Sequence, residues 1–187
     1  MIFVQTDLTR GSITGKLLKF ALPMMAGNLL QQCYNIADTL IVGRALGASA
    51  LASVGFSFTL MTFLTSILLG MCMGSGAVFS IRFGEGDLPR LKNSLVLSFF
   101  MIAGFTVVLN LGVFLLIDPM MALLQVPTEV YPLMRSYLWV IFFGIGETFL
   151  YNYFACLLRA VGNSLAPLVF LGISALLNIV LDVVFVV

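Results

Sequence analysis

Long apolar runs separated by short polar segments dominate the pattern of this chain. Each run holds about 20 or more mainly apolar residues, the length that a helix needs to cross a bilayer. The pattern predicts five membrane-spanning helices, at residues 17–42, 50–80, 94–117, 131–156 and 165–187. The sequence therefore predicts an all-α polytopic membrane protein, whose short linkers favour neighbouring antiparallel helices.

The composition supports the prediction of a membrane protein and argues against several other classes of protein. Apolar residues make up 61% of the chain and charged residues only 9%, with a mean hydropathy of +1.14. The net charge of +1 indicates no nucleic-acid partner. The three cysteines fall singly in three different spans and histidine is absent, which argues against zinc, haem and disulfide frameworks. We therefore expect the lipid bilayer to be the main partner, and no cofactor.

Basic residues are distributed unevenly among the predicted linkers. With the N-terminus inside, only Arg44 and Arg135 lie on the outer side. The cytoplasmic side then holds Arg10, Lys16, Lys19, Arg82, Arg90, Lys92 and Arg159. This asymmetry follows the positive-inside rule. We predict a multi-pass protein of the inner (plasma) membrane of the cell, with a cytoplasmic N-terminus.

The first predicted span has one polar face. Its polar residues recur every three or four positions: Asn28, Gln31, Gln32, Asn35, Asp38 and Thr39. Lipid cannot satisfy amides or a carboxylate, so this face must look into the bundle or onto a watery cavity. We predict that Asn28, Gln31, Gln32 and Asn35 line a substrate cavity. For any one amide, bonding to a neighbouring helix is an equal alternative.

Two aspartates lie deep inside apolar runs. Asp38 is in the first run, and Asp182 is in the fifth, one helical turn after Asn178. A carboxylate at such a depth is costly and marks an ion path by default. Both helices run outward, so the two carboxylates and the amide oxygen of Asn178 could share one site. Hard oxygen ligands suit Na⁺ or a proton rather than a transition metal.

Three further residues are candidates for transport. Glu147 lies near the middle of the fourth span and could bind a cationic substrate, pair with an arginine or sit protonated. Tyr34 could line an aromatic pocket for a lipophilic cation, although packing is the commoner role. Pro23 frees a carbonyl in the first span, so it predicts either a hinge or an ordinary membrane-helix proline.

Two smaller patterns predict local structure. Asp87, followed by Pro89, predicts the capped start of a short amphipathic helix in the inner loop 83–92. Gly70, Gly74 and Gly76 form a stripe of small residues in the second span, which predicts close helix packing.

Four segments together resemble the N-terminal lobe of multidrug and toxic compound extrusion (MATE) transporters. They are LTRGSITGKLLKFALPMMAGNLLQQCYNIADTLIVGRALGASALASVG, FGEGDLPRLKNS, LLRAVGNSLAP and LLNIVLDVVFVV. The resemblance covers essentially the whole chain. It implies five helices of a six-helix lobe, with residues 1–187 forming a partial lobe. The sixth helix and the C-terminal lobe are absent from the sequence, so we expect a partial chain.

The resemblance also implies a function, which is transport and not enzymatic catalysis. MATE transporters export cationic or lipophilic drug-like compounds in exchange for Na⁺ or H⁺. Asp38 matches their acidic position in the first helix, Asn178 and Asp182 match the cation-site pair in the fifth, and Pro23 matches the bending proline. Two alternatives stay open. One is a non-transporting helical fragment or half of a split transporter. The other is a flippase for lipid-linked saccharides, which would favour a more basic cavity.

Overall fold

The computed structural model describes residues 12–186, and every regular element in that range is a helix. The helices are α1 (Ile13–Ala45), α2 (Ala48–Gly84), α3 (Leu88–Leu123), α4 (Tyr131–Ile141), the 3₁₀ turn η1 (Phe142–Gly144), α5 (Ile145–Ala160) and α6 (Leu165–Val186). Because α4, η1 and α5 follow one another without a linker, the chain forms five helical rods. The all-α class and the number of five long helices are therefore confirmed, and most of the rods extend beyond the limits predicted for the spans.

Four of the five rods are long and apolar enough to cross a membrane. They are Ala48–Gly84, Leu88–Leu123, Tyr131–Ala160 and Leu165–Phe185, within the described residues. The helix α1 has 33 residues, so its length suffices. The helix α1 is less apolar than the other four rods, because amides and charged residues interrupt its apolar run. The predicted span with the polar face is thus the least lipid-like of the five.

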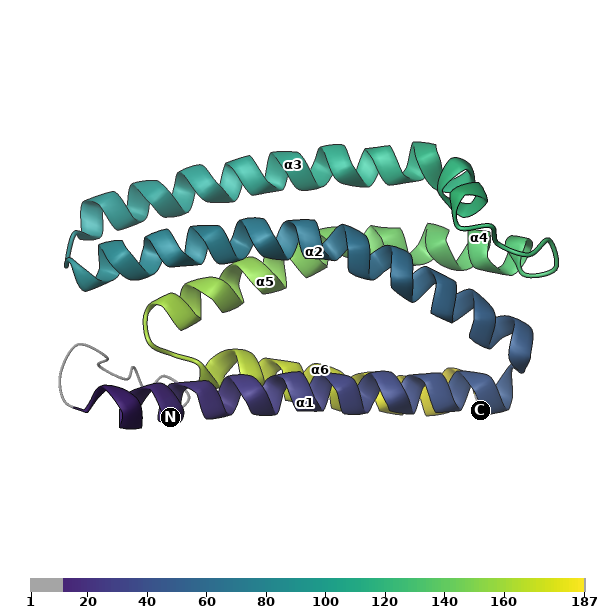
Figure 1. Cartoon of the computed structure of the whole chain (residues 1–187), viewed down its shortest axis with the longest axis horizontal. Coiled ribbons are helices and arrows are strands. Elements are labelled where there is room, and N and C mark those ends of the chain that lie inside the picture. The colour runs from purple at the N-terminus through teal and green to yellow at the C-terminus, as the bar shows by residue number, and fades with distance from the viewer. Residues whose placement is uncertain (1–11, 187) are drawn as a thin grey trace.

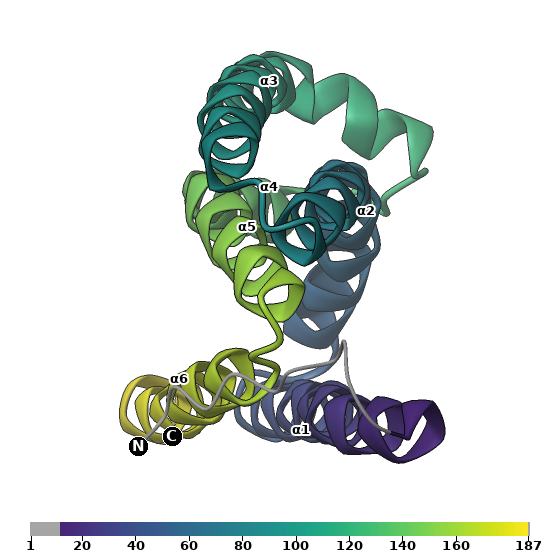
Figure 2. The ribbon, with the colours of Figure 1, turned by 90° about the vertical axis from the view of Figure 1, so that its left-hand side faces the viewer.

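The rods form two layers that are joined at their ends. Figure 1 shows α1 and α6 side by side below, with α2, α3, α4 and α5 above them, and Figure 2 shows the same separation from the end. We call the upper layer, including η1, the four-helix group, and the lower layer the α1–α6 pair. The α1–α2 turn and the α5–α6 turn connect them, at opposite ends of the molecule.

The apolar core lies entirely within the four-helix group. Its fully buried side chains include Phe79 of α2, Ile102 of α3, Met134 and Leu138 of α4, and Phe142 of η1. Lipid tails are as apolar as leucine, so these contacts stabilise the group mainly through close van der Waals packing. The four-helix group is therefore the rigid part of the fold.

The start of α3 shows which local prediction was right and which was wrong. Asp87 caps the helix, since its Oδ1 accepts a hydrogen bond of 3.0 Å from the backbone N–H of Arg90. Pro89 lies in the first turn, as the sequence indicated. The prediction of a short separate helix is wrong, because α3 continues for 36 residues through the membrane. Nothing between Asp87 and the apolar run breaks the helix.

The fourth rod changes direction at η1. The side-chain amide of Asn110 on α3 donates a hydrogen bond of 2.6 Å to the carbonyl oxygen of Phe142, which satisfies a backbone acceptor at the 3₁₀ turn. A 3₁₀ stretch inside a long helix often marks a bend. Figure 1 shows α5 leaving the direction of α4 and leaning toward the α1–α6 pair. The bend lets α5 form one wall of the space between the layers.

Only one of the three glycines in the predicted stripe packs closely. A Cβ added at Gly76 would lie 3.3 Å from the Cβ of Cys156 on α5. At Gly70 and Gly74 it would meet nothing within 4 Å in the part of the chain that the structure describes. The packing prediction is confirmed for Gly76 and wrong for the other two, because a stripe of small residues does not tell which turn faces a neighbour.

Candidate functional site

The α1–α6 pair brings together the three residues predicted to bind a cation. Asp38 of α1 and Asp182 of α6 are both partly buried, and the charge of Asp182 acts directly on Asp38. Asn178 precedes Asp182 by one turn on α6 and is also partly buried. Two like charges at short range repel each other strongly in a medium of low dielectric constant. A positive charge placed between the two carboxylates would offset this repulsion.

Two oxygen atoms at this place have no partner. Oδ1 of Asn178 and Oδ2 of Asp182 are both buried, and neither accepts a hydrogen bond in the described chain. Buried polar atoms are rarely left unpaired, and such an exception calls for an explanation, of which a functional role is one. Carboxylate and amide oxygens are ligands that suit Na⁺, and a carboxylate also suits a proton. The donor set thus fits either Na⁺ or a proton.

Sequence reasoning missed a residue that faces these carboxylates from the other layer. Tyr137 of α4 lies within electrostatic range of both Asp38 and Asp182. Its ring belongs to the four-helix group, whereas the two acids belong to the α1–α6 pair. The sequence offered no signal, because nothing in the fourth span reveals which of its aromatic residues points at the first and fifth helices.

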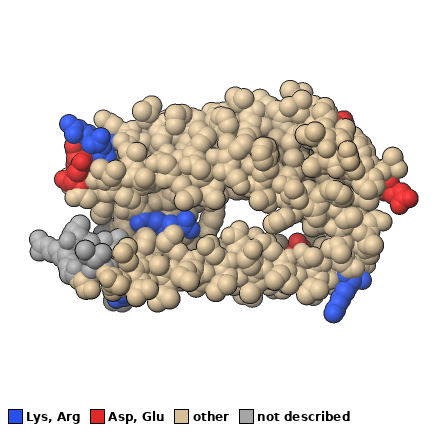
Figure 3. Space-filling model, viewed as in Figure 1, with Lys and Arg blue, Asp and Glu red and all other residues tan. Residues whose placement is uncertain are grey.

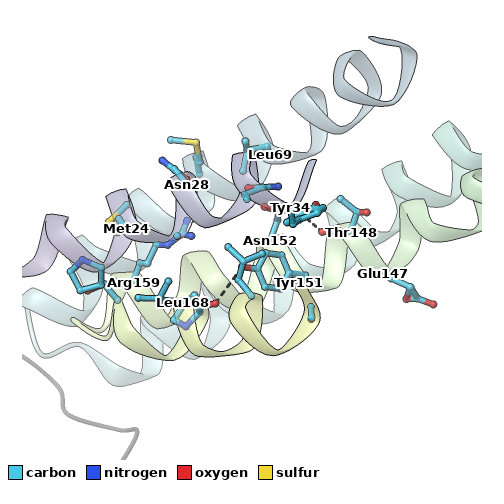
Figure 4. A pocket seen from close by; sticks show the side chains of 18 residues that line it. Met24, Asn28, Tyr34, Leu69, Glu147, Thr148, Tyr151, Asn152, Arg159 and Leu168 are labelled. Atoms are coloured by element: carbon cyan, nitrogen blue, oxygen red, sulfur yellow. Dashed lines mark hydrogen bonds between the residues drawn. The ribbon is translucent and has the colours of Figure 1, made fainter. Parts of the chain in front are cut away.

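A cavity of about 590 Å³ lies between the two layers. Its lining comes from α1, α2, α5 and α6, with Ser164 from the α5–α6 turn, and includes Leu69, Met73, Thr148, Tyr151, Asn152, Leu168 and Leu171. Figure 4 shows side chains from α1 and α5 converging on this space. The volume and the mixture of apolar walls with a few polar groups are typical of a site for a small organic molecule.

The polar face of α1 divides between two environments. Asn28, Gln31 and Tyr34 line the cavity, together with Pro23. Gln32 and Asn35 are not part of the lining. The Nδ2 of Asn35 donates a hydrogen bond of 3.2 Å to Oε1 of Gln32, so these two amides satisfy each other along the helix. A spacing of three or four residues defines a broad face, and the cavity occupies only one edge of it.

Glu147 and Pro23 both touch the cavity, at different places. Glu147 is exposed at its margin, and Figure 4 shows its carboxylate pointing away from the other labelled side chains. Pro23 lies in the lining, and α1 continues through it without interruption. Proline has no N–H, so one turn of α1 lacks a backbone hydrogen bond here.

Arg159 is a second residue whose role the sequence did not reveal. The sequence predicts that it belongs to the cytoplasmic linker after the fourth span, whereas it lies in the final turn of α5 and lines the cavity. Its Nε is buried without a hydrogen-bond partner. Figure 4 shows the side chain reaching toward α1 near Met24, and Figure 3 shows a basic side chain inside the space between the layers. The cavity therefore holds a positive charge.

Charges outside this space gather at the two ends of the molecule (Figure 3). Besides Arg159, which lines the cavity, the described basic residues of the end formed by the α2–α3 and α5–α6 turns are Lys16, Lys19, Arg82, Arg90 and Lys92. Arg44 and Arg135 are at the opposite end, where Arg135 donates a hydrogen bond of 2.9 Å to Asp118. Arg10 lies outside the described residues. The fold thus keeps the charge asymmetry of the sequence.

Known proteins match this arrangement throughout the chain. The sequence profile of the MatE family matches residues 23–184. The probable multidrug resistance protein YpnP of Bacillus subtilis is 31% identical over 180 residues, which cover 96% of this chain and 40% of that protein. An FAD transporter of Shewanella oneidensis is 26% identical over 170 residues, 89% of this chain and 36% of that protein.

Solved structures agree with the sequence matches. One, described as the outward-facing conformation of a multidrug resistance MATE family transporter of the MOP superfamily, superposes with a TM-score of 0.88 at 25% identity, over 98% of this chain and 41% of that chain. A bundle of long apolar helices beside a cavity defines the class of a multi-pass membrane protein. The chain belongs to the MatE family, and it spans about two fifths of the length of the relatives that it matches.

Proposed function

We propose that the protein to which this chain contributes is an antiporter that exports cationic or lipophilic drug-like compounds in exchange for Na⁺ or H⁺. One observation carries the proposal. Buried, unpartnered oxygens of Asn178 and Asp182 lie beside Asp38, at the interface of a helix pair that also forms one wall of a cavity of about 590 Å³. An ion bound there and a compound bound in the cavity contact the same two helices.

This shared wall provides a physical route for coupling. A proton or Na⁺ between Asp38 and Asp182 removes the repulsion between the carboxylates, which draws α1 toward α6. The turn of α1 that lacks a hydrogen bond at Pro23 gives way most easily, and Pro23 lines the cavity. The ion then stabilises one shape of the cavity and the compound another, so that each favours release of the other.

The relatives support small-molecule transport and leave the cargo open. Their names include multidrug resistance proteins and an FAD transporter. The chain also corresponds to the first five helices of a six-helix N-terminal lobe. A sixth helix and a second lobe, in the same or a separate chain, would close the cavity on its open side. We place the protein in the plasma membrane with its N-terminus in the cytoplasm, on the side of the larger number of basic residues.

Efflux from cells tests the proposal. The complete protein is expressed in bacteria that lack their own exporters, and ethidium efflux is followed by fluorescence after an imposed Na⁺ or pH gradient. Asp38→Asn and Asp182→Asn should each abolish gradient-driven efflux while the amount of protein in the membrane stays the same. The gradient that drives the wild-type protein identifies the ion.

Gln32→Ala is the matched control, because Gln32 lies on the same helix and outside the cavity lining. It should retain most of the wild-type rate. Wild-type efflux in both aspartate variants would refute the coupling role. No efflux from the wild-type protein with any tested cation would refute the proposed function.

A further inference from the structure

We infer that Arg159 forms an anion-binding subsite at the inner end of the cavity, so that the transported compounds include aromatic molecules with a carboxylate or phosphate group. The inference rests on the proposed transport function and names a substrate class for the same cavity. It differs from the cationic class, which the acidic residues of the sequence favoured.

The first observation is the environment of the guanidinium group. Arg159 lines the cavity from the last turn of α5, and its Nε is buried without a partner. None of the salt bridges found among residues 12–186 involves it. A guanidinium presents a planar fork of donors that matches a carboxylate or a phosphate. A buried donor with no acceptor is costly, and an oxyanion in the cavity would supply the acceptor.

The surroundings of Arg159 add to its preference for an anion. The helix α6 begins beside it, and both Ser164 and Pro167 at that helix start belong to the cavity lining. Helix N-termini carry a partial positive charge and unpaired N–H groups. One N–H of the first turn, that of Ala166, is already bonded to Asn163. The start of α6 thus adds to the positive potential around Arg159, although it does not form a binding site by itself.

The rest of the lining suits an aromatic body rather than a second charge. Tyr34 and Tyr151 supply flat faces, and Asn28, Gln31 and Asn152 supply amides. The acidic residue of the lining, Glu147, is exposed at the far margin and twelve positions away from Arg159 along the same rod. The cavity is therefore positive at its inner end and neutral along its walls, which fits an aromatic acid with its charge toward the cytoplasm.

Two dyes that differ by one carboxylate test the subsite. Rhodamine 110 has a free carboxylate, and rhodamine 123 is its methyl ester. Both are titrated by fluorescence polarisation against the complete protein in phosphatidylcholine nanodiscs. Arg159→Gln should weaken the binding of rhodamine 110 about tenfold and leave that of rhodamine 123 within about twofold. Arg159→Lys should retain part of the preference, since it keeps the charge but loses the fork.

Arg90→Gln is the matched control, because Arg90 is an arginine near the same end of the molecule that pairs with Asp87 and does not line the cavity. It should change the binding of neither dye. Equal losses for both dyes in Arg159→Gln would show that Arg159 only supports the fold. No loss for either dye, or no binding of rhodamine 110 by the wild-type protein, would also overturn the inference.

A lipid phosphate could reach Arg159 from the bilayer instead of a transported acid. The titrations are therefore repeated with phosphatidylglycerol in the nanodiscs. Unchanged affinity for rhodamine 110 supports a substrate subsite, whereas weaker binding in the wild-type protein but not in Arg159→Gln assigns the subsite to lipid and overturns the inference. The ethidium efflux assay is independent of both results. If ethidium efflux is observed without the predicted dye preference, the anion subsite is refuted and the proposed antiporter function is not.

Discussion

The four-helix group and the α1–α6 pair are built in opposite ways. In the four-helix group, bulky side chains such as Met134, Leu138 and Phe142 are fully buried in one apolar cluster. In the described part of the α1–α6 pair, the buried residues are smaller and none is as bulky as leucine: Gly27, Val42, Ala166, Pro167 and Ala175. The pair instead brings together two carboxylates and an amide, and the buried oxygens Oδ1 of Asn178 and Oδ2 of Asp182 have no partner there. One layer is stabilised by packing, and the other is arranged around groups that packing does not satisfy.

This difference indicates which part moves. Displacing a helix of the four-helix group would break interlocked contacts between large side chains, because a close-packed core tolerates little deformation. Displacing the α1–α6 pair as a unit against the four-helix group breaks few such contacts, because α1 and α6 pack mainly on each other and touch the other layer sparsely. The four-helix group is thus a scaffold, and under the proposed function the α1–α6 pair is the part whose position a bound ion would alter.

The largest effect should come from opening a hole in the scaffold. Leu138→Ala should lower the free energy of unfolding by about 3 kcal/mol, through lost contacts and the cavity left behind. Leu115→Ala is the control, since Leu115 is 82% exposed on α3 and should change stability little. Thermal unfolding of the purified protein in detergent measures both. Equal losses would contradict the placement of the core.

A somewhat smaller effect should follow from wedging α2 away from α5. Gly76→Leu should destabilise the protein by about 2 kcal/mol, because the new side chain overlaps Cys156. Gly74→Leu, on the same helix with open space around its Cα, should be close to neutral. The same unfolding assay applies. A neutral Gly76→Leu would mean that α2 and α5 do not pack as closely as described.

Removing helix caps should have a smaller effect in both layers. Asp87→Ala removes the cap of α3 in the four-helix group, and Asn163→Ala removes the bond to Ala166 at the start of α6. Each should lower stability by about 1 kcal/mol. Asp87→Asn should restore most of the loss, since an amide oxygen also caps. A larger loss for Asn163→Ala is expected, because Asn163 is only 2% exposed and Asp87 is more accessible.

The smallest effect should come from removing the hydroxyl of Tyr137, which lies in the four-helix group within electrostatic range of the two acids of the α1–α6 pair. Tyr137→Phe should raise the concentration of driving ion needed for half-maximal efflux by about threefold, the size of a weak electrostatic interaction, and should leave the free energy of unfolding unchanged. Tyr151→Phe is the control, because its hydroxyl lies near the carbonyl of Pro167 rather than near the two acids. If only Tyr151→Phe alters the ion dependence, Tyr137 has no part in coupling.

The sequence was most informative where one-dimensional patterns determine structure. Apolar runs determine the number of spans, because each must bury its backbone polar groups within a helix. Asp87 and Pro89 marked the start of α3 for the same local reason. The proximity of Asp38 and Asp182 could also be predicted from the sequence. Two carboxylates in helices that run in the same direction have few other ways to avoid lipid.

Contacts between helices could not be predicted from the sequence in the same way. Tyr137 and Arg159 became notable only when the bend at η1 placed them against α1 and α6, and no periodicity encodes that bend. Arg159 looked like one more basic residue of an inner loop. Gln32 shares a face with Asn28 but lies outside the cavity, because a helical face is wider than the cavity edge. Side-chain roles in this fold depend on which rods are neighbours.

The packing of α1 against α6, the first and last described helices, has a consequence for biosynthesis. The contact between α1 and α6 requires the chain from Ala45 to Leu165 to be made first, which takes a ribosome on the order of 10 s. During that interval Asp38 and the amides of α1 have no α6 to face. Photo-crosslinking from position 38 in arrested nascent chains should show contact with the insertion machinery until α6 has emerged. The helix α6, which brings Asp182 to Asp38, is therefore also the one that we expect to release α1 from the insertion machinery.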